Sequence, residues 1–382
     1  MKHLLQTVIC SLALVISANA QNLVPLHEFG NGSDGAQPYS GVILDPLGNM
    51  YGTTYTGGAG RGIVYKLNAH VETILHKFFD ISGGLHPMGP LTEDAAGNLY
   101  GTTQIGGDSK SCPNLKNPGA SGCGVVFKLA GKVETVLYEF HNGADGKYPV
   151  QGLTIDSTGN LFGSSDTAIF EIQNGKFTII ASVPVLSNLL PDGQGNLYGI
   201  SADNNLFEVS VATGLVTILY TFQGMGVGDG LTLMGSLISD ASGNIYGTTE
   251  FGGVPGCPTL PLNPLHGVDL GCGTLYKWSQ GVETVLYRFQ PTPAPHNPQF
   301  GVIQDAAGNF YGVTAALAED EGDIYEVTSQ GTEVTLHSFK GPRDGGFPQG
   351  SLVLGGNGTL YGTSSLFGKY GQGTVYSYCI CK

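Results

Sequence analysis

Short apolar runs alternate along the chain with polar turns rich in glycine, asparagine and aspartate. In the first unit the runs occupy residues 41–44, 50–54, 62–67 and 71–78, separated by a Gly-Asn turn, a Gly-Gly loop and a polar turn. Short runs bounded by turn residues predict β-strands. We therefore expect each unit of the chain to form four strands, and no helical period interrupts them.

One phrase, Gly-Asn-Leu-Tyr-Gly-Thr-Thr in its fullest form, occurs seven times in related forms. Its aromatic residue returns every 36 to 65 residues, which suits a four-stranded repeat with loops of variable length. The strands carry apolar residues on both faces, as expected when each small sheet lies between two others. The pattern predicts an all-β, seven-bladed propeller with four antiparallel strands per blade. The aromatic markers are Tyr51, Tyr100, Phe162, Tyr198, Tyr246, Tyr311 and Tyr361.

The two ends of the chain predict how the ring closes. Residues 23–29 match fourth strands such as residues 282–289, whereas the last apolar run, residues 373–378, is a third strand. The seventh unit therefore lacks a fourth strand, and the beginning of the chain has a spare one. Pairing them would leave no unpaired edge. We expect residues 23–29 to complete blade 7.

The first residues are typical of a secretory signal peptide. An apolar stretch at residues 4–17 precedes the small-residue site at residues 18–20, which predicts a signal peptide over residues 1–20 and one propeller domain over residues 21–382. No other segment is a candidate membrane span. Without the leader the chain has 15 basic and 30 acidic residues, a formal charge of −15. That charge argues against nucleic acid or an anionic membrane as partner, and we expect an exported monomer.

Six cysteines remain after the leader, an even number that fits disulfides in an exported protein. Four of them form two pairs, each within one loop between a second and a third strand, and their spacing does not fit a zinc site. The third pair, Cys379 and Cys381, is too close in sequence to bridge without strain, so neither a bridge nor free thiols are predicted there. The predicted bridges are Cys112 to Cys123 and Cys257 to Cys272.

The chain resembles the GloVer tandem-repeat proteins, exported bacterial proteins described as choice-of-anchor. The similarity covers the mature chain, and its most specific parts are residues 97–103, 106–107, 122–129 and 134–140. It implies an exported, propeller-like repeat protein and brings no catalytic residues with it. Residues 377–382 depart from the family pattern, because they form neither a hydrophobic tail nor a sorting signal.

Two groups of aspartates recur in the repeats. The first group precedes the Gly-Asn turn at a fixed spacing, where a short carboxylate accepts backbone N–H bonds, so we interpret it as structural. It comprises Asp45, Asp94, Asp156, Asp192, Asp240 and Asp305.

The second group lies in the loops between blades, before the first strand. These residues are candidates for ligand binding or for a calcium site at one rim of the ring, and the alternative is turn chemistry. The group comprises Asp34, Asp145, Asp229 and Asp344.

An acidic run in the loop of blade 6 is the candidate for an isolated Ca²⁺ site, and the alternative is a solvated charged loop. No other cofactor is expected. The run contains Glu319, Asp320, Glu321 and Asp323.

His86 and His296 lie in loops between blades and are the two histidines that we consider for function. With the second group of aspartates they complete the candidate ligand-binding set, and they are the candidate catalytic residues if the protein is an enzyme.

Loop lengths favour a binding function. The loops at residues 106–124 and 252–273 are long, whereas those at residues 165–168 and 201–204 are short, so we expect a walled cleft on the rim. We interpret the protein as an exported, non-enzymatic binding protein for a glycan or an extracellular protein. The alternative is a polysaccharide-active lyase or hydrolase that uses rim carboxylates and a rim histidine.

Overall fold

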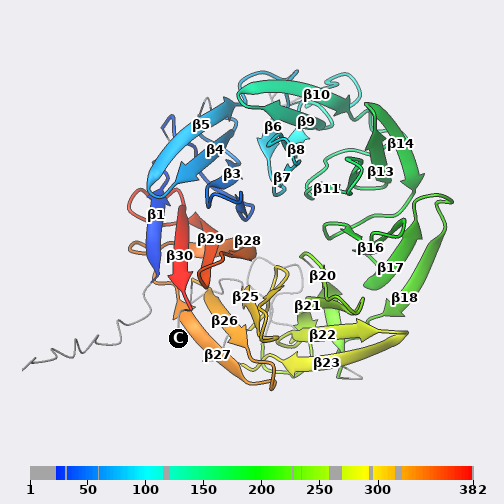
Figure 1. Ribbon diagram of the computed structural model, residues 1–382, viewed down its shortest axis with the longest axis vertical. Helices are drawn as coiled ribbons and strands as arrows, with labels where there is room; N and C mark the ends of the chain where they lie inside the picture. The colour runs from blue at the N-terminus through cyan, green and yellow to red at the C-terminus, as the bar shows by residue number, and fades with distance from the viewer. Residues whose placement is uncertain are drawn as a thin grey trace, which may run out of the picture.

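The computed structural model describes residues 23–380 except 31, 59, 115–120, 226–227, 234, 258–268, 292–295 and 315–320. Seven β-sheets surround a central axis, as Figure 1 shows. In blades 1 to 6 the strand order follows the chain from the inner to the outer edge, whereas the outer strand of blade 7 is β1; blades 2 and 5 have their first strand in two pieces. The predicted seven-bladed propeller is confirmed. Residues 1–20, the predicted signal peptide, lie outside the described residues.

Blades 1 to 4 follow one another along the first half of the chain. Their strands are β2 (Ile43–Leu44), β3 (Met50–Thr54), β4 (Ile63–Asn68) and β5 (Val71–Lys77) in blade 1; β6 (Leu85–Pro87), β7 (Thr92–Glu93), β8 (Leu99–Ile105), β9 (Val125–Ala130) and β10 (Val133–Glu139) in blade 2; β11 (Thr154–Ile155), β12 (Leu161–Ser164), β13 (Ile169–Gln173) and β14 (Lys176–Ala181) in blade 3; and β15 (Leu190–Pro191), β16 (Asn196–Ile200), β17 (Asn205–Ser210) and β18 (Val216–Thr221) in blade 4.

Blades 5 to 7 complete the ring. Their strands are β19 (Gly230–Leu233), β20 (Ile238–Ser239), β21 (Ile245–Gly252), β22 (Thr274–Ser279) and β23 (Val282–Arg288) in blade 5; β24 (Ile303–Gln304), β25 (Phe310–Val313), β26 (Asp323–Val327) and β27 (Glu333–Ser338) in blade 6; and β28 (Gly346–Leu354), β29 (Thr359–Leu366), β30 (Thr374–Cys379) and β1 (Val24–Glu28) in blade 7.

The ring closes through β1, the strand nearest the beginning of the described chain. It pairs antiparallel with β30, near the end of the chain, as the blue and red strands in Figure 1 show. The Phe29 amide donates a hydrogen bond to the Gly373 carbonyl at 3.0 Å, and the Phe29 side chain is fully buried. The predicted closure is confirmed.

Aromatic rings fill the seams between blades. At six of the seven seams, the phenylalanine that follows the fourth strand of one blade packs edge-on against an aromatic residue in the third strand of the next blade. Phe29 and Tyr65 illustrate this contact, with ring centroids 5.3 Å apart. The glycine of the repeated phrase makes room for the third-strand ring, because a Cβ at Gly52 would lie 2.4 Å from the Tyr65 hydroxyl. The repeated phrase is therefore a packing requirement.

The outer strands are bent. In each of the seven blades the pairing between the third and the outer strand contains a register shift, such as the one between Val136 and Tyr138 in β10. An extra residue of this kind bends a strand and increases its twist. Within the described part of the chain, no helix is long and apolar enough to cross a membrane.

Candidate functional site

The aspartates before the Gly-Asn turns hold those turns together. In blade 2, Asp94 Oδ1 accepts the amides of Ala96 and Asn98, each at 2.9 Å. Its Oδ2 accepts the Asn98 side chain at 2.7 Å and the Tyr100 hydroxyl at 2.9 Å. The amide and asparagine bonds recur at the equivalent aspartates of blades 1, 3, 4, 5 and 6. The structural interpretation of this group is confirmed.

The aspartates of the loops between blades have a second repeated role. Each accepts the backbone amide of the residue that follows the buried phenylalanine at the end of the outer strand, at 2.8 to 3.0 Å. Asp145 and Asp229 also accept hydroxyl bonds from Tyr138 and Tyr220, each at 3.0 Å. These carboxylates therefore cap the exit of their own outer strand. The four acceptors are Asp34, Asp145, Asp229 and Asp344.

The candidate carboxylates do not converge on a cation. Within the described residues, no group of three or more His, Cys, Asp or Glu side chains could hold a metal ion. Of the acidic run in blade 6, Glu319 and Asp320 lie outside the described residues. Asp323 is buried at the start of β26, where its amide donates to the Thr314 hydroxyl at 3.0 Å.

The two candidate histidines occupy different environments. His86 is half-buried and lies against Tyr55, with ring centroids 4.5 Å apart and Nδ1 2.9 Å from the Tyr55 carbonyl oxygen. Burial lowers the pKa of His86, so its ring is neutral at neutral pH. His296 is 5% exposed, so its side chain is not presented to solvent. Of the two, His86 is the one available at the surface.

The loops between blades carry a ring of strained backbone. Six residues without the freedom of glycine adopt a left-handed conformation at equivalent positions, with φ between 51° and 59°. The amide of His86 donates to Arg61, and that of Tyr148 donates to Cys123, in both cases to the end of a second-to-third-strand loop in the preceding blade. The two kinds of loop therefore meet on one rim, as expected. The six residues are Gln37, His86, Tyr148, Thr232, Asn297 and Phe347.

Both predicted disulfides are present. Cys112 is bonded to Cys123, with Cα atoms 5.3 Å apart, and Cys257 is bonded to Cys272, with Cα atoms 5.0 Å apart. Each bridge closes a rim loop within its own blade. The middle parts of these loops, residues 115–120 and 258–268, lie outside the described residues, as does Cys381.

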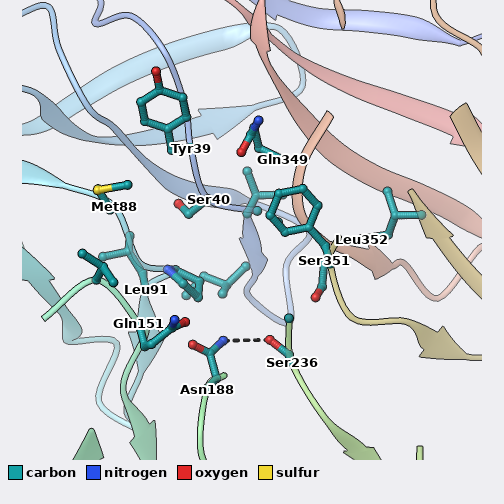
Figure 2. A pocket seen from close by; sticks show the side chains of 18 of the residues that line it. Tyr39, Ser40, Met88, Leu91, Gln151, Asn188, Ser236, Gln349, Ser351 and Leu352 are labelled. Carbon is teal, nitrogen blue, oxygen red and sulfur yellow. Dashed lines mark hydrogen bonds between the residues drawn. The ribbon is translucent and has the colours of Figure 1, made fainter. Parts of the chain in front are cut away.

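A cavity of 470 Å³ lies at the centre of the ring, and Figure 2 shows its lining. All seven blades contribute, because the lining residues come from the segment around each first strand. In the sequence, the lining begins two residues after the rim residues that have a left-handed backbone. Tyr39 follows Gln37 in this way, and Gln349 follows Phe347. The volume lies within the range of small-molecule sites.

The lining of this central cavity is uncharged. Among the described residues that line it, none is Asp, Glu, His, Lys or Arg. Its polar side chains are four amides and four hydroxyl groups, set among apolar residues, and both kinds of group donate and accept hydrogen bonds. Two aromatic rings add flat apolar surface. These amide and aromatic residues are Tyr39, Gln151, Asn188, Gln299, Phe300 and Gln349.

Hydrogen bonds between blades fix part of this lining. Asn188 accepts the Gly152 amide at 2.7 Å and donates to the Ser236 hydroxyl at 2.8 Å, so it links blades 3, 4 and 5. The second of these bonds is the dashed line in Figure 2. Neighbouring first strands also touch through backbone, because a Cβ at Gly301 would lie 2.1 Å from the Ser236 carbonyl oxygen. The cavity is therefore preformed.

The central cavity was missed by reasoning from residue types. That reasoning selected aspartates and histidines, whereas the cavity is lined by residues two to six positions before the turn aspartate, such as Tyr39 before Asp45. A signal was available, since these positions vary among blades while the residues around them repeat.

Solved structures of distant sequence are similar to the chain in fold. The crystal structure of the computationally designed Ika8 protein has a TM-score of 0.50 and 11% identity, over 93% of this chain and 99% of that one. A crystal structure of a Bacteroides thetaiotaomicron protein of unknown function has a TM-score of 0.43 and 12% identity, over 94% and 97% of the two chains. At such identities only the fold is comparable.

Sequence comparison identifies the family. A search of the curated proteins gives no match. The model of the Gloeobacter/Verrucomicrobia repeat matches residues 14–167 and 265–380, more than half of the chain. Together with the seven-fold repeat and the propeller that it forms, this match shows that the chain belongs to the Gloeobacter/Verrucomicrobia repeat family.

Proposed function

We propose that the protein is an exported, non-enzymatic binding propeller whose ligand is a neutral glycan held in the central cavity. The observation that carries this proposal is the lining itself, a preformed and uncharged concavity with converging amide side chains and two aromatic rings. Side-chain amides donate and accept at once, which matches the mixed donor and acceptor character of sugar hydroxyls. The disulfides support export, because they persist in oxidising compartments.

The lining favours a neutral ligand over a charged one. A charged group that enters an uncharged cavity loses its hydration without gaining an ionic partner. The formal charge of −14 for the whole chain further disfavours polyanions, which include acidic polysaccharides and nucleic acids.

The cavity offers a peptide ligand no long, accessible sheet edge to pair with. Peptides commonly add a strand to an exposed sheet edge. The inner strands here are short, as in β2, and neighbouring ones pack backbone against backbone: a Cβ at Gly41 would lie 2.5 Å from the Ser351 carbonyl oxygen. An edge of this kind offers little room for an added strand.

One observation supports the enzymatic alternative, a polysaccharide-active hydrolase or lyase. The Glu250 carboxyl accepts a hydrogen bond at 2.9 Å from Gln299, which lines the cavity. Burial raises the pKa of Glu250, as in carboxyl groups that act as general acids. Hydrolysis of a glycosidic bond ordinarily uses two carboxyl groups. Among the described residues, the cavity lining itself contains no carboxyl group, and Glu250 lies behind it, so we rank binding first.

The test is a screen of purified protein against neutral and acidic glycans, followed by calorimetry and analysis of the glycans for cleavage. We expect binding of neutral glycans, no products, and a loss of affinity of about tenfold or more in Gln151→Ala. The matched control is Gln194→Ala, since Gln194 is an exposed turn residue outside the cavity. Cleavage that is abolished by Glu250→Gln would replace the binding proposal with the enzymatic one. Absence of binding to every neutral glycan would refute the binding proposal, and absence of cleavage of any glycan would refute the enzymatic one.

A further inference from the structure

An aromatic cluster adjoins the central cavity over blades 1 and 2. Tyr39, which lines the cavity, lies edge-on to Tyr55 with ring centroids 5.2 Å apart, and Tyr55 lies against His86 at 4.5 Å. All three side chains are half-buried. Figure 2 shows Tyr39 at the edge of the cavity near Gln349 and Met88. We call Tyr39, Tyr55 and His86 the aromatic ledge.

Polar contacts hold the ledge in place. The Tyr55 hydroxyl donates to Gln104 at 3.1 Å, and the His86 amide donates to the Arg61 carbonyl at 2.9 Å. His86 also has a left-handed backbone, with φ of 59°, a conformation that it shares with the equivalent residues of five other blades. The three rings are thus fixed before any ligand arrives.

The ledge occurs at one place in the ring. The position of Tyr55, ten residues after the turn aspartate, is occupied in the other blades by non-aromatic residues. The repeat therefore does not require an aromatic residue there, and packing of the blades does not explain it. The non-aromatic equivalents are Gln104, Asp166, Ala202, Glu250, Ala315 and Ser365.

We propose that the aromatic ledge is a second saccharide subsite, so that the ligand is a linear neutral oligosaccharide that runs from the central cavity outward over blades 1 and 2. This inference rests on the proposed function. A pyranose ring has an apolar face of C–H groups, which packs on a flat ring and buries apolar surface. Rigid aromatic side chains bind at low cost in conformational entropy. Tyr39 lies at the junction and contacts both subsites.

The chemistry of the ledge agrees with that of the cavity. The imidazole of His86 is neutral at neutral pH, because burial lowers its pKa. The His86 ring therefore adds no positive charge that would select an anionic sugar, which agrees with the uncharged lining of the cavity.

The experiment compares the affinities of cello-, manno-, xylo- and malto-oligosaccharides of one to six units for the full mature protein, by calorimetry. Two subsites predict that affinity rises by about tenfold or more from one unit to three in at least one series. His86→Asn removes the ring, while asparagine tolerates the left-handed backbone. In this variant we expect the affinity no longer to rise with the number of sugar units, while the affinity for a single unit stays unchanged.

Two variants serve as controls. Tyr148→Asn changes the equivalent left-handed residue of blade 3, which is exposed, and should leave the dependence on length intact. Gln194→Ala, at an exposed turn outside the cavity and the ledge, should bind like the wild type. Thermal unfolding of every variant checks that the ring is intact.

The outcomes separate the two proposals. Binding of single sugars with no gain for longer chains, or a gain that survives in His86→Asn, would refute the ledge and leave the cavity proposal standing. Absence of binding in all four series, with no neutral glycan bound in the wider screen, would refute the proposed function and the ledge with it.

Discussion

His76 Nε2 lies 3.4 Å from Glu134 Oε2 across the seam between the outer strands of blades 1 and 2. Both side chains are largely buried, 14% and 15% exposed. Burial, together with the nearby charge of Asp80, raises the pKa of the Glu134 carboxyl to about 7. Burial also lowers the pKa of the His76 imidazole. Burial therefore disfavours the charged form of both side chains in this contact.

The same position recurs at other seams with different chemistry. His27 lies 3.9 Å from Glu72 where β1 meets blade 1, and burial raises the pKa of Glu72 to about 7. Between blades 2 and 3 the pair is replaced by Tyr138 stacked on Phe177, with centroids 3.5 Å apart. Stacked rings and neutral polar pairs thus occupy the same place, which indicates that the seam needs filled, uncharged contacts.

The first prediction concerns the pH dependence of stability. The Glu134 pKa rises from 4.5 to about 7 on folding, so the stability linked to its proton is full below pH 4.5 and is lost as the pH rises through 7. Glu134→Gln mimics the protonated acid. We expect a melting temperature ~1 to 3 °C above wild type at pH 8 and close to wild type at pH 5. Thermal unfolding by circular dichroism measures both.

The histidine of this pair acts in the opposite direction. Because the pKa of His76 is lowered on folding, the contribution of its neutral ring to the free energy of unfolding is full above pH 6.5 and is lost as the pH falls.

The variant Glu283→Gln should reproduce the effect of Glu134→Gln, since burial also raises the pKa of Glu283 to about 7. A change in melting temperature that is equal at pH 5 and pH 8 would show that these glutamates do not titrate in this range.

Much of the fold was predictable because repetition makes each signal visible several times. The turn at Asp94 and the strand after it recur around the ring, and the unmatched strand at residues 23–29 has one available edge to pair with. Strand lengths were less predictable. The run at residues 41–44 forms only the two-residue strand β2, because Gly41 packs against the neighbouring blade instead of extending the ladder.

The candidate site was less predictable than the fold. Asp145 and His86 are residue types that often do chemistry, but in this protein Asp145 caps its own outer strand. Whether residues such as Gln151 and Gln349 meet depends on the curvature that brings seven first strands together. That arrangement is a property of the closed ring, so the variable positions become a site only when the seven blades are placed around one axis.

The second prediction tests the turn aspartates. Asp94→Ala removes the acceptor of four hydrogen bonds, so we expect a loss of ~1 to 3 kcal/mol in the free energy of unfolding. Asp203→Ala, at an exposed position, is the control and should change stability by less than ~0.5 kcal/mol. Urea unfolding of both variants gives the comparison. If Asp94→Ala and the wild type have equal free energies of unfolding, water replaces the hydrogen bonds of the turn at no cost.

The same aspartates predict resistance to mild acid. Burial alone would raise the pKa of Asp240, but the bonds from Asn244, Tyr246 and Ser242 outweigh it and lower that pKa to about 2. The linked stability is therefore full above pH 3.8 and is lost as the pH falls through 2. Titration of the Asp240 carboxyl by NMR near pH 4 would contradict this.

The third prediction concerns the rim bridges. Replacing Cys112 and Cys123 with serine opens a loop with a sequence separation of 11, which should cost ~2 to 3 kcal/mol. Unfolding should remain cooperative, because the bridge lies within one loop and the blades supply the core. Proteolysis should become faster within that loop. Peptide mapping of the native protein should recover Cys112 linked to Cys123, and a link from either residue to Cys257 or Cys272 would contradict the structure.

The fourth prediction tests ring closure within a single strand and its flank. Phe29 is fully buried against Tyr65, whereas Val24, at the start of β1, is 46% exposed. Phe29→Ala should therefore cost ~3 to 5 kcal/mol, and Val24→Ala, the matched control, should cost less than ~0.5 kcal/mol. A chain that starts at residue 31 lacks β1 altogether and exposes the outer edge of β30, so it should melt earlier and aggregate. If Phe29→Ala and the truncated chain both unfold at the wild-type temperature, β1 does not close the ring in solution, and the seam between blades 7 and 1 must be held by other contacts.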